Sequence, residues 1–106
     1  MKDSISILIV DDHPLFRQGL VNALYSCDFN KTIFEAGSGK EALQLIEKES
    51  LDIILMDINM PEMDGLECSK LILEKHPDLK IIGISSFEDK WTIEQMLRLG
   101  SKRISH

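Results

Sequence analysis

Carboxylates stand directly after two short apolar segments of the sequence. Asp11 and Asp12 follow residues 5–10, and Asp57 follows residues 53–56. Apolar runs of this length without alternation suit strands of a parallel sheet that is covered on both faces. The carboxyl ends of such strands share one edge of the sheet, where open α/β folds place their ligands and their chemistry. We therefore expect Asp11, Asp12 and Asp57 to meet at this edge.

Three carboxylates in one pocket repel each other unless a cation compensates them. Oxygen ligands of this kind suit Mg²⁺, which accepts one or two carboxylates and keeps several waters. A carboxylate beside such a cation can attack a phosphoryl group and become an acyl phosphate. Asp57 is the best candidate for the nucleophile because its segment is the most central, and Asp11 and Asp12 are candidate metal ligands. The simpler alternatives are turn residues and helix caps.

A hydroxyl group occupies the equivalent position after the fourth apolar segment. Ser85 follows residues 79–84. Its hydroxyl can donate a hydrogen bond to a phosphate oxygen, so that modification of Asp57 would draw the following loop inwards. The alternative for Ser85 is an ordinary turn or cap residue.

Helical patterns separate the apolar segments along the whole chain. A second strand is expected over residues 32–36, where β-forming residues cluster. The four helices are expected to begin near Pro14, Ser38, Asp64 and Asp89, and Gly100 is expected to end the last one. Trp91 falls off the apolar face of that helix. This alternation predicts an α/β fold with a parallel sheet and right-handed crossovers.

Length and charge describe one acidic domain. The chain has 106 residues, of which 43% are hydrophobic and 28% charged, and its formal net charge is −6. The Lys and Arg residues are scattered, so the chain lacks the basic patch of a nucleic-acid binder. No segment has the length of a membrane span or the pattern of a signal peptide. We therefore expect a cytoplasmic protein that contacts neither DNA nor membranes.

The cysteines and histidines lack the spacing of a metal site. Cys27 and Cys68 are expected to be free thiols. His13 follows the acidic pair and is interpreted as a helix-start residue rather than a ligand.

Three motifs of this sequence resemble the receiver domain of bacterial two-component response regulators. They are the acidic pair Asp11-Asp12, the stretch Met56-Asp57-Ile58-Asn59-Met60-Pro61 with Asp64-Gly65, and Ser85 after Ile81-Ile82-Gly83-Ile84. The stretch from Asp11 to Leu20 further resembles the branch whose receivers precede a LuxR- or NarL-type helix-turn-helix output domain. The resemblance covers nearly the whole chain, from about Ser4 to Gly100.

The resemblance implies a flavodoxin-like (CheY-like) doubly wound sheet of strand order 2-1-3-4-5. It implies that Asp57 takes a phosphoryl group from a sensor histidine kinase in a Mg²⁺-dependent reaction, and that the domain controls an output such as transcription. Asp12 and Asp57 would bind Mg²⁺ directly, Asp11 would act through water, and the backbone carbonyl of Asn59 would complete the protein ligands. Ser85 matches the switch hydroxyl. Such a domain phosphorylates and dephosphorylates only itself and is no enzyme for other substrates.

The sequence departs from this family after Gly100. The fifth strand and helix of family members have no counterpart, and the lysine that pairs with the phosphate is not matched by Lys102 or His106. We expect residues 1–106 to form one receiver domain that is incomplete at its C-terminal end and lacks an output domain. An absent edge strand would leave the ladder groups of its neighbour open, which favours a homodimer with paired or exchanged elements at that edge.

Two other functions fit parts of the pattern. One is a phosphatase of the haloacid-dehalogenase kind, but that family has a second Asp where this chain has Asn59, and the second acid must protonate the leaving group. The other is an interaction or dimerisation fragment that cannot be phosphorylated because its fifth strand is absent.

Overall fold

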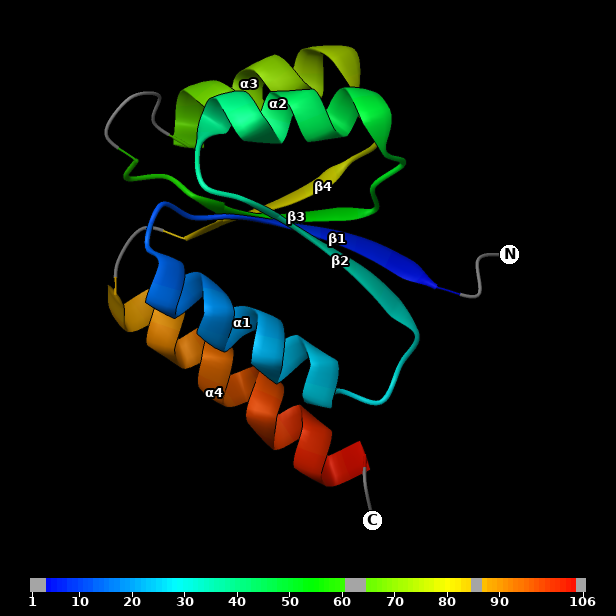
Figure 1. Ribbon diagram of the computed structural model, residues 1–106, viewed down its shortest axis with the longest axis vertical. Helices are drawn as coiled ribbons and strands as arrows, with labels where there is room; N and C mark the ends of the chain where they lie inside the picture. The colour runs from blue at the N-terminus through cyan, green and yellow to red at the C-terminus, as the bar shows by residue number, and fades with distance from the viewer. Residues whose placement is uncertain (1–3, 61–64, 85–86, 105–106) are drawn as a thin grey trace.

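Strands and helices alternate in the computed structural model, which describes residues 4–60, 65–84 and 87–104 (Figure 1). The elements in chain order are β1 (Ile5–Val10), α1 (Pro14–Ser26), β2 (Lys31–Ala36), α2 (Gly39–Lys48), β3 (Ile53–Asp57), α3 (Gly65–Lys75), β4 (Lys80–Ile84) and α4 (Phe87–Ile104). The strands form one parallel sheet of order β2-β1-β3-β4. This confirms the predicted α/β class, and the order equals the first four positions of the implied flavodoxin-like sheet. Pro61, Asp64 and Ser85 lie outside the described residues.

The two central strands supply the core on both faces of the sheet. Leu8 and Ile54 belong to a cluster that includes buried side chains of α2 and α3. Ile9 and Leu55 belong to a second cluster, formed with α1 and α4. Since successive side chains of a strand point to opposite faces, unbroken apolar runs such as these need a helical layer on each side.

Helices α2 and α3 cover one face of the sheet, and α1 and α4 cover the other (Figure 1). Right-handed crossovers account for the first three helices, because α1 leads from β1 towards one edge while α2 and α3 lead towards the other. If a helix connected β4 to a further parallel strand beside it, a right-handed crossover would place that helix on the same face of the sheet as α3. No strand follows α4 within residues 87–104, and α4 packs beside α1 over the apolar residues of β3 and β4.

Local chemistry explains where two of the helices begin. His13 is the N-cap residue of α1 and Pro14 is at its first turn, where the missing N–H costs nothing. Ser38 is the N-cap residue of α2, and its hydroxyl accepts a hydrogen bond from the backbone N–H of Glu41 at 3.2 Å. Both starts were expected from the sequence.

The bounds of α4 correct two expectations. The helix begins at Phe87, so Asp89 lies in its first turn and does not precede it. It continues past Gly100 to Ile104, so Gly100 is not its stop. One glycine inside a helix costs only about 1 kcal/mol relative to Ala, which need not end it. Met96, which the pattern assigns to the apolar face, is exposed like Trp91.

Both cysteines are buried free thiols, as expected. The thiol of Cys68 lies 3.9 Å from the carbonyl oxygen of Gly39, where α3 packs on α2. Burial raises the pKa of the Cys68 thiol, so this side chain stays protonated and unreactive at neutral pH. Cys68 is therefore a packing residue.

Candidate functional site

Asp11 follows β1 directly and lies buried at the carboxyl end of the sheet. Its backbone N–H continues the ladder by donating to the carbonyl of Ala36 at the end of β2, at 3.0 Å. Its side-chain Oδ1 accepts a hydrogen bond from the backbone N–H of His13 at 2.8 Å. This side-chain turn directs the chain out of the sheet and towards α1.

Asp57 is the last residue of β3 and is buried as well. Its Oδ1 accepts a hydrogen bond from the backbone N–H of Asn59 at 2.9 Å, which is the arrangement seen at Asp11. The loop that follows is held against β4, because the N–H of Ile58 donates to the carbonyl of Ile84 at 3.0 Å. Asp57 is thus fixed by both its strand and its loop.

The structure brings the predicted carboxylates together. Ligand atoms of Asp11, Asp12, His13 and Asp57 all lie within 4.8 Å of one another. His13, interpreted from the sequence as a helix-start residue, is indeed the N-cap residue of α1. It also lies within the acidic cluster, because its Nδ1 is 3.3 Å from Asp11 Oδ1 and 3.1 Å from Asp12 Oδ1. Asn59 adjoins the cluster because its backbone N–H donates a hydrogen bond to Asp57 Oδ1.

Lys90 of α4 is the functional residue that the sequence analysis missed. Its side chain is 5% exposed, and its Nζ lies 3.1 Å from Asp11 Oδ2 and 3.1 Å from Asp57 Oδ2. The ring centroid of Phe16 is 5.1 Å from the same nitrogen. A signal was present, since Lys90 precedes Ile93 and Leu97 by three and seven residues and therefore shares their inward face.

The charges and open lone pairs of the cluster suit a divalent cation. Three carboxylates against one ammonium leave a net charge of −2 when His13 is neutral. Asp11 Oδ2 and Asp12 Oδ1 are buried and accept no hydrogen bond from the described residues, although each has a nitrogen 3.1 Å away. Carboxylate oxygens in an anionic pocket are the donor type that Mg²⁺ prefers.

Arg17 supports the site from α1. Its Nη1 donates to the backbone carbonyl of Asp11 at 2.6 Å, and its Nε donates to Glu35 Oε1 of β2 at 3.1 Å. The guanidinium group therefore joins the ends of two neighbouring strands to the first helix, and it fixes the backbone of Asp11 rather than its carboxylate.

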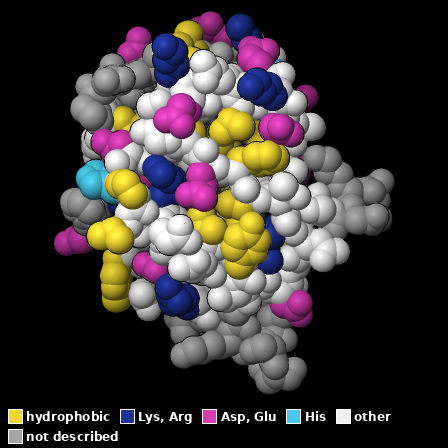
Figure 2. Space-filling view, in the orientation of Figure 1, with side chains coloured by type: hydrophobic (Ala, Val, Ile, Leu, Met, Phe, Trp, Pro, Cys, Tyr) yellow, Lys and Arg dark blue, Asp and Glu magenta, His cyan; other side chains and the backbone are white. Residues whose placement is uncertain are grey.

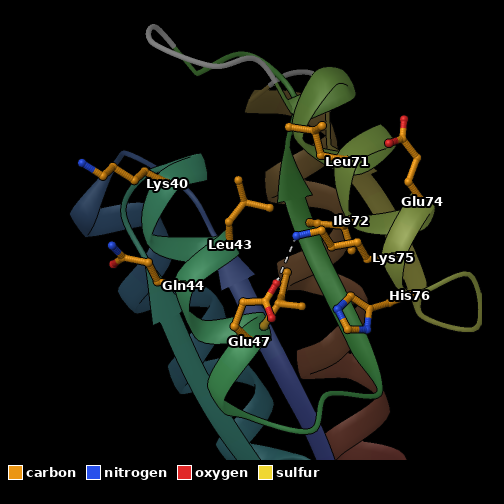
Figure 3. A pocket seen from close by; sticks show the side chains of 10 residues that line it. Lys40, Leu43, Gln44, Glu47, Leu71, Ile72, Glu74, Lys75 and His76 are labelled. Atoms are coloured by element: carbon orange, nitrogen blue, oxygen red, sulfur yellow. Dashed lines mark hydrogen bonds and ion pairs between the residues drawn. The ribbon is translucent and has the colours of Figure 1, made fainter.

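A groove of about 360 Å³ lies between α2 and α3 and shares no residue with the acidic cluster (Figure 3). Apolar side chains such as Leu43, Leu71 and Ile72 line it, and Lys75 Nζ pairs with Glu47 Oε1 across it at 3.5 Å. This ion pair is exposed, and exposed pairs contribute little. The groove has no constellation of reactive groups, so we place the candidate site at the acidic cluster.

The outer surface agrees with the acidic composition. On the face shown in Figure 2, Lys and Arg side chains are interspersed with Asp and Glu side chains and form no continuous basic patch. None of the helices among the described residues is both long and apolar enough to cross a membrane.

Known proteins share this fold and sequence pattern. Residues 7–104 match the family described as the response regulator receiver domain. The transcriptional regulatory protein DegU of Brevibacillus brevis is 34% identical over 100 residues, which cover 94% of this chain and 42% of DegU. The chain thus spans less than half the length of such curated relatives.

Solved structures agree with this match. The signal receiver domain of the response regulator NarL from Mycobacterium tuberculosis is 33% identical with a TM-score of 0.71, over 79% of this chain and 68% of that one. The response regulator TrrA of Thermotoga maritima, solved with Mg²⁺ and BeF, is 31% identical with a TM-score of 0.72, over 88% and 80%. TrrA has also been solved in complex with the histidine kinase ThkA, at 34% identity and a TM-score of 0.68, over 77% and 69%.

The match over residues 7–104, the sheet order and the acidic cluster at the carboxyl ends of β1 and β3 lead to the same conclusion. The chain belongs to the response regulator receiver domain family.

Proposed function

We propose that this domain is a signalling switch that accepts a phosphoryl group on Asp57. The donor is a phosphohistidine of a sensor kinase, and the reaction depends on Mg²⁺. The observation that supports this most directly is the placement of Asp57: its carboxylate is buried at the end of a central strand, within 4.8 Å of ligand atoms of Asp11 and Asp12. The domain modifies only itself and has no other substrate.

The transfer needs one bond to form and one to break. An oxygen of the Asp57 carboxylate attacks phosphorus, the bond from phosphorus to the histidine nitrogen breaks, and that nitrogen keeps the electron pair. The hydrogen bond from Asn59 N–H to Oδ1 holds the carboxylate in one orientation before the donor arrives. Such pre-positioning lowers the barrier without any rearrangement during the reaction.

Asp12 and Asp57 would hold Mg²⁺ directly, with the carbonyl of Asn59 as a further ligand and Asp11 acting through water. The bound cation supplies neutralisation of the charge on the phosphoryl oxygens. The buried oxygens Asp11 Oδ2 and Asp12 Oδ1, which accept no hydrogen bond from the part of the chain that the structure describes, support this assignment. Ser85, outside the described residues, is the proposed switch hydroxyl.

The relatives suggest the setting of this switch. DegU is named a transcriptional regulatory protein, and TrrA forms a complex with a histidine kinase. We therefore propose a cytoplasmic location for this domain, a sensor histidine kinase as its partner, control of transcription as the output, and a homodimer as the working form.

The test is phosphorylation of the purified chain by acetyl phosphate with Mg²⁺, measured by intact-protein mass spectrometry. We expect one added phosphoryl group, complete loss of that addition in Asp57→Asn, and loss again when EDTA removes the metal. Glu47→Gln, a carboxylate removed from the distant α2–α3 groove, is the matched control and should react like the wild type. Addition that persists in Asp57→Asn would refute the assignment of the acceptor.

A folded chain that binds Mg²⁺ but gains no phosphoryl group would favour the interaction fragment instead. Hydrolysis of an external phosphate ester with turnover would favour the phosphatase.

A further inference from the structure

Lys90 is the only ammonium group among the described residues that is buried against the candidate metal ligands. Its Nζ lies 3.1 Å from Oδ2 of both Asp11 and Asp57 and 5.1 Å from the ring centroid of Phe16. A buried charge is stable only with close partners, and these two carboxylates provide them. The carboxylates in turn need a cation, so each side stabilises the other.

The ammonium is already paired with Oδ2 of Asp57, the proposed direct metal ligand. The Oδ1 atoms of Asp11 and Asp57 each accept a backbone hydrogen bond, from His13 and Asn59. Their Oδ2 atoms face Lys90. Mg²⁺ binds carboxylate oxygens at about 2.1 Å. A Mg²⁺ ion beside Oδ2 of Asp57 would therefore lie close to the ammonium, where two cations repel strongly in a buried site.

We propose that Lys90 is an internal cation that occupies the metal-binding position and must leave it before Mg²⁺ binds. This inference rests on the metal site of the proposed function and assigns its regulation. Lys90 belongs to the first full turn of α4, so its departure changes the contact between that turn and the ends of β1 and β3. Metal occupancy is thereby coupled to the position of α4.

The first experiment uses the wild-type protein and asks whether Mg²⁺ exposes Lys90. The protein is acetylated briefly with an amine-reactive ester, with and without Mg²⁺, and the modified lysines are quantified by peptide mass spectrometry. Without metal we expect Lys90 to react at least about tenfold more slowly than Lys75, whose side chain is 74% exposed. Saturating Mg²⁺ should raise the rate at Lys90 several-fold and leave Lys75 unchanged. Protection of Lys90 that persists in Mg²⁺ would overturn the proposal.

The second experiment measures the competition through Mg²⁺ affinity by titration calorimetry. Lys90→Met keeps the length and apolar stem of the side chain and removes its charge. We expect Lys90→Met to bind Mg²⁺ about tenfold more tightly or better, because the metal no longer has to displace an ion pair. Lys75→Met removes an exposed charge and should bind like the wild type. Equal affinities for Lys90→Met and the wild type would contradict the competition.

Trp91 provides an independent signal. It is the single tryptophan of the chain, follows Lys90 directly and is exposed. In the wild type, Mg²⁺ should change its emission with the same midpoint as the calorimetric titration, and in Lys90→Met this change should be largely lost. An emission change of equal size in both proteins would also overturn the coupling to α4.

The outcomes separate this inference from the proposed function. If the wild type binds Mg²⁺ and gains a phosphoryl group while Lys90 stays protected, only the inference fails. If neither the wild type nor Lys90→Met binds Mg²⁺, the proposed metal site fails and the inference fails with it. Should Lys90→Met not fold, the acetylation of the wild type decides alone.

Discussion

Asp11 and Asp57 are each held by a side-chain turn at the end of a strand. In each, one carboxylate oxygen accepts the backbone N–H two residues further on, and the other faces Lys90. The first contact is local and fixes the orientation of the carboxylate. The second contact depends on α4, whose Lys90 lies 33 residues after Asp57 in the sequence. The local hydrogen bonds therefore orient the two carboxylates, and the packing of α4 supplies the ammonium group that compensates their charge.

Gly65 is required at the residue scale because the backbone after β3 passes directly beside it. A Cβ at this position would lie 2.5 Å from the carbonyl oxygen of Asp57 and would also overlap Cα of Ile58. Backbone atoms cannot give way as a flexible side chain can. We expect Gly65→Ala to lower the free energy of unfolding by about 1–3 kcal/mol, measured by urea denaturation, and to slow phosphorylation of Asp57.

The control for this prediction is Gly83→Ala in β4. Among the described residues, the added Cβ would meet only Cγ2 of Ile58, at 3.4 Å, which is ordinary contact. We expect a much smaller change in stability and a normal phosphorylation rate. Equal losses in the two variants would mean that close approach to the β3 loop is not the cause.

At the scale of the element, α2 depends on its N-cap. The hydroxyl of Ser38 accepts the backbone N–H of Glu41, one of the N–H groups that the helix itself cannot pair. Ser38→Ala should lower the free energy of unfolding by about 1 kcal/mol, measured by urea denaturation, whereas Ser38→Asn keeps an acceptor and should cost only a few tenths. A loss as large in Ser38→Asn would argue against the cap.

Elements with a local cause were predictable from the sequence. Apolar runs that end in Asp or Ser predicted three of the strands, and a cluster of β-forming residues predicted β2. Pro14 and the Ser38 capping box predicted the starts of two helices. The same runs predicted that Asp11, Asp12 and Asp57 meet, because parallel strands end at one edge.

Local patterns did not predict on which face of the sheet α4 packs or which carboxylates Lys90 contacts. The crossover rule fixes the side of a helix only when the helix connects two strands of the sheet, and α4 makes no such connection within the described residues. Its burial of Lys90 follows from that face. The spacing of Lys90 from Ile93 and Leu97 marks its inward face. Its pairing with Asp11 and Asp57 still depends on tertiary packing, because a lone lysine in a helical pattern is ordinarily solvent-facing.

At the scale of the whole molecule, the outer edge of β4 lies beside exposed apolar surface. Within the described residues, β4 pairs only with β3, so its other row of N–H and C=O groups faces outwards. Beside it, Ile82 is 42% exposed and borders an apolar hollow of about 260 Å³ with Ile93 and Leu97. Unpaired ladder groups next to apolar surface favour association through that edge.

We therefore expect sedimentation equilibrium to detect dimers at a protein concentration on the order of 10 µM. Ile82→Lys should shift the protein towards the monomer, because a charge would have to be buried in the contact. Leu73→Lys on α3, where the wild-type side chain is 41% exposed, is the matched control and should leave the dimer intact. A monomer at all concentrations would refute association at this edge.

The central place of β1 affects how the chain is made. β1 leaves the ribosome before its sheet neighbours β2 and β3, and β3 ends only at Asp57. The intervening 47 residues, 11–57, take roughly 2–10 s to synthesise at about 5–20 residues per second. During this time the apolar strand Ile5–Val10 has no complete cover. Nascent chains that stop before Asp57 should accordingly need a chaperone to stay in solution, and chains that extend past β4 should not.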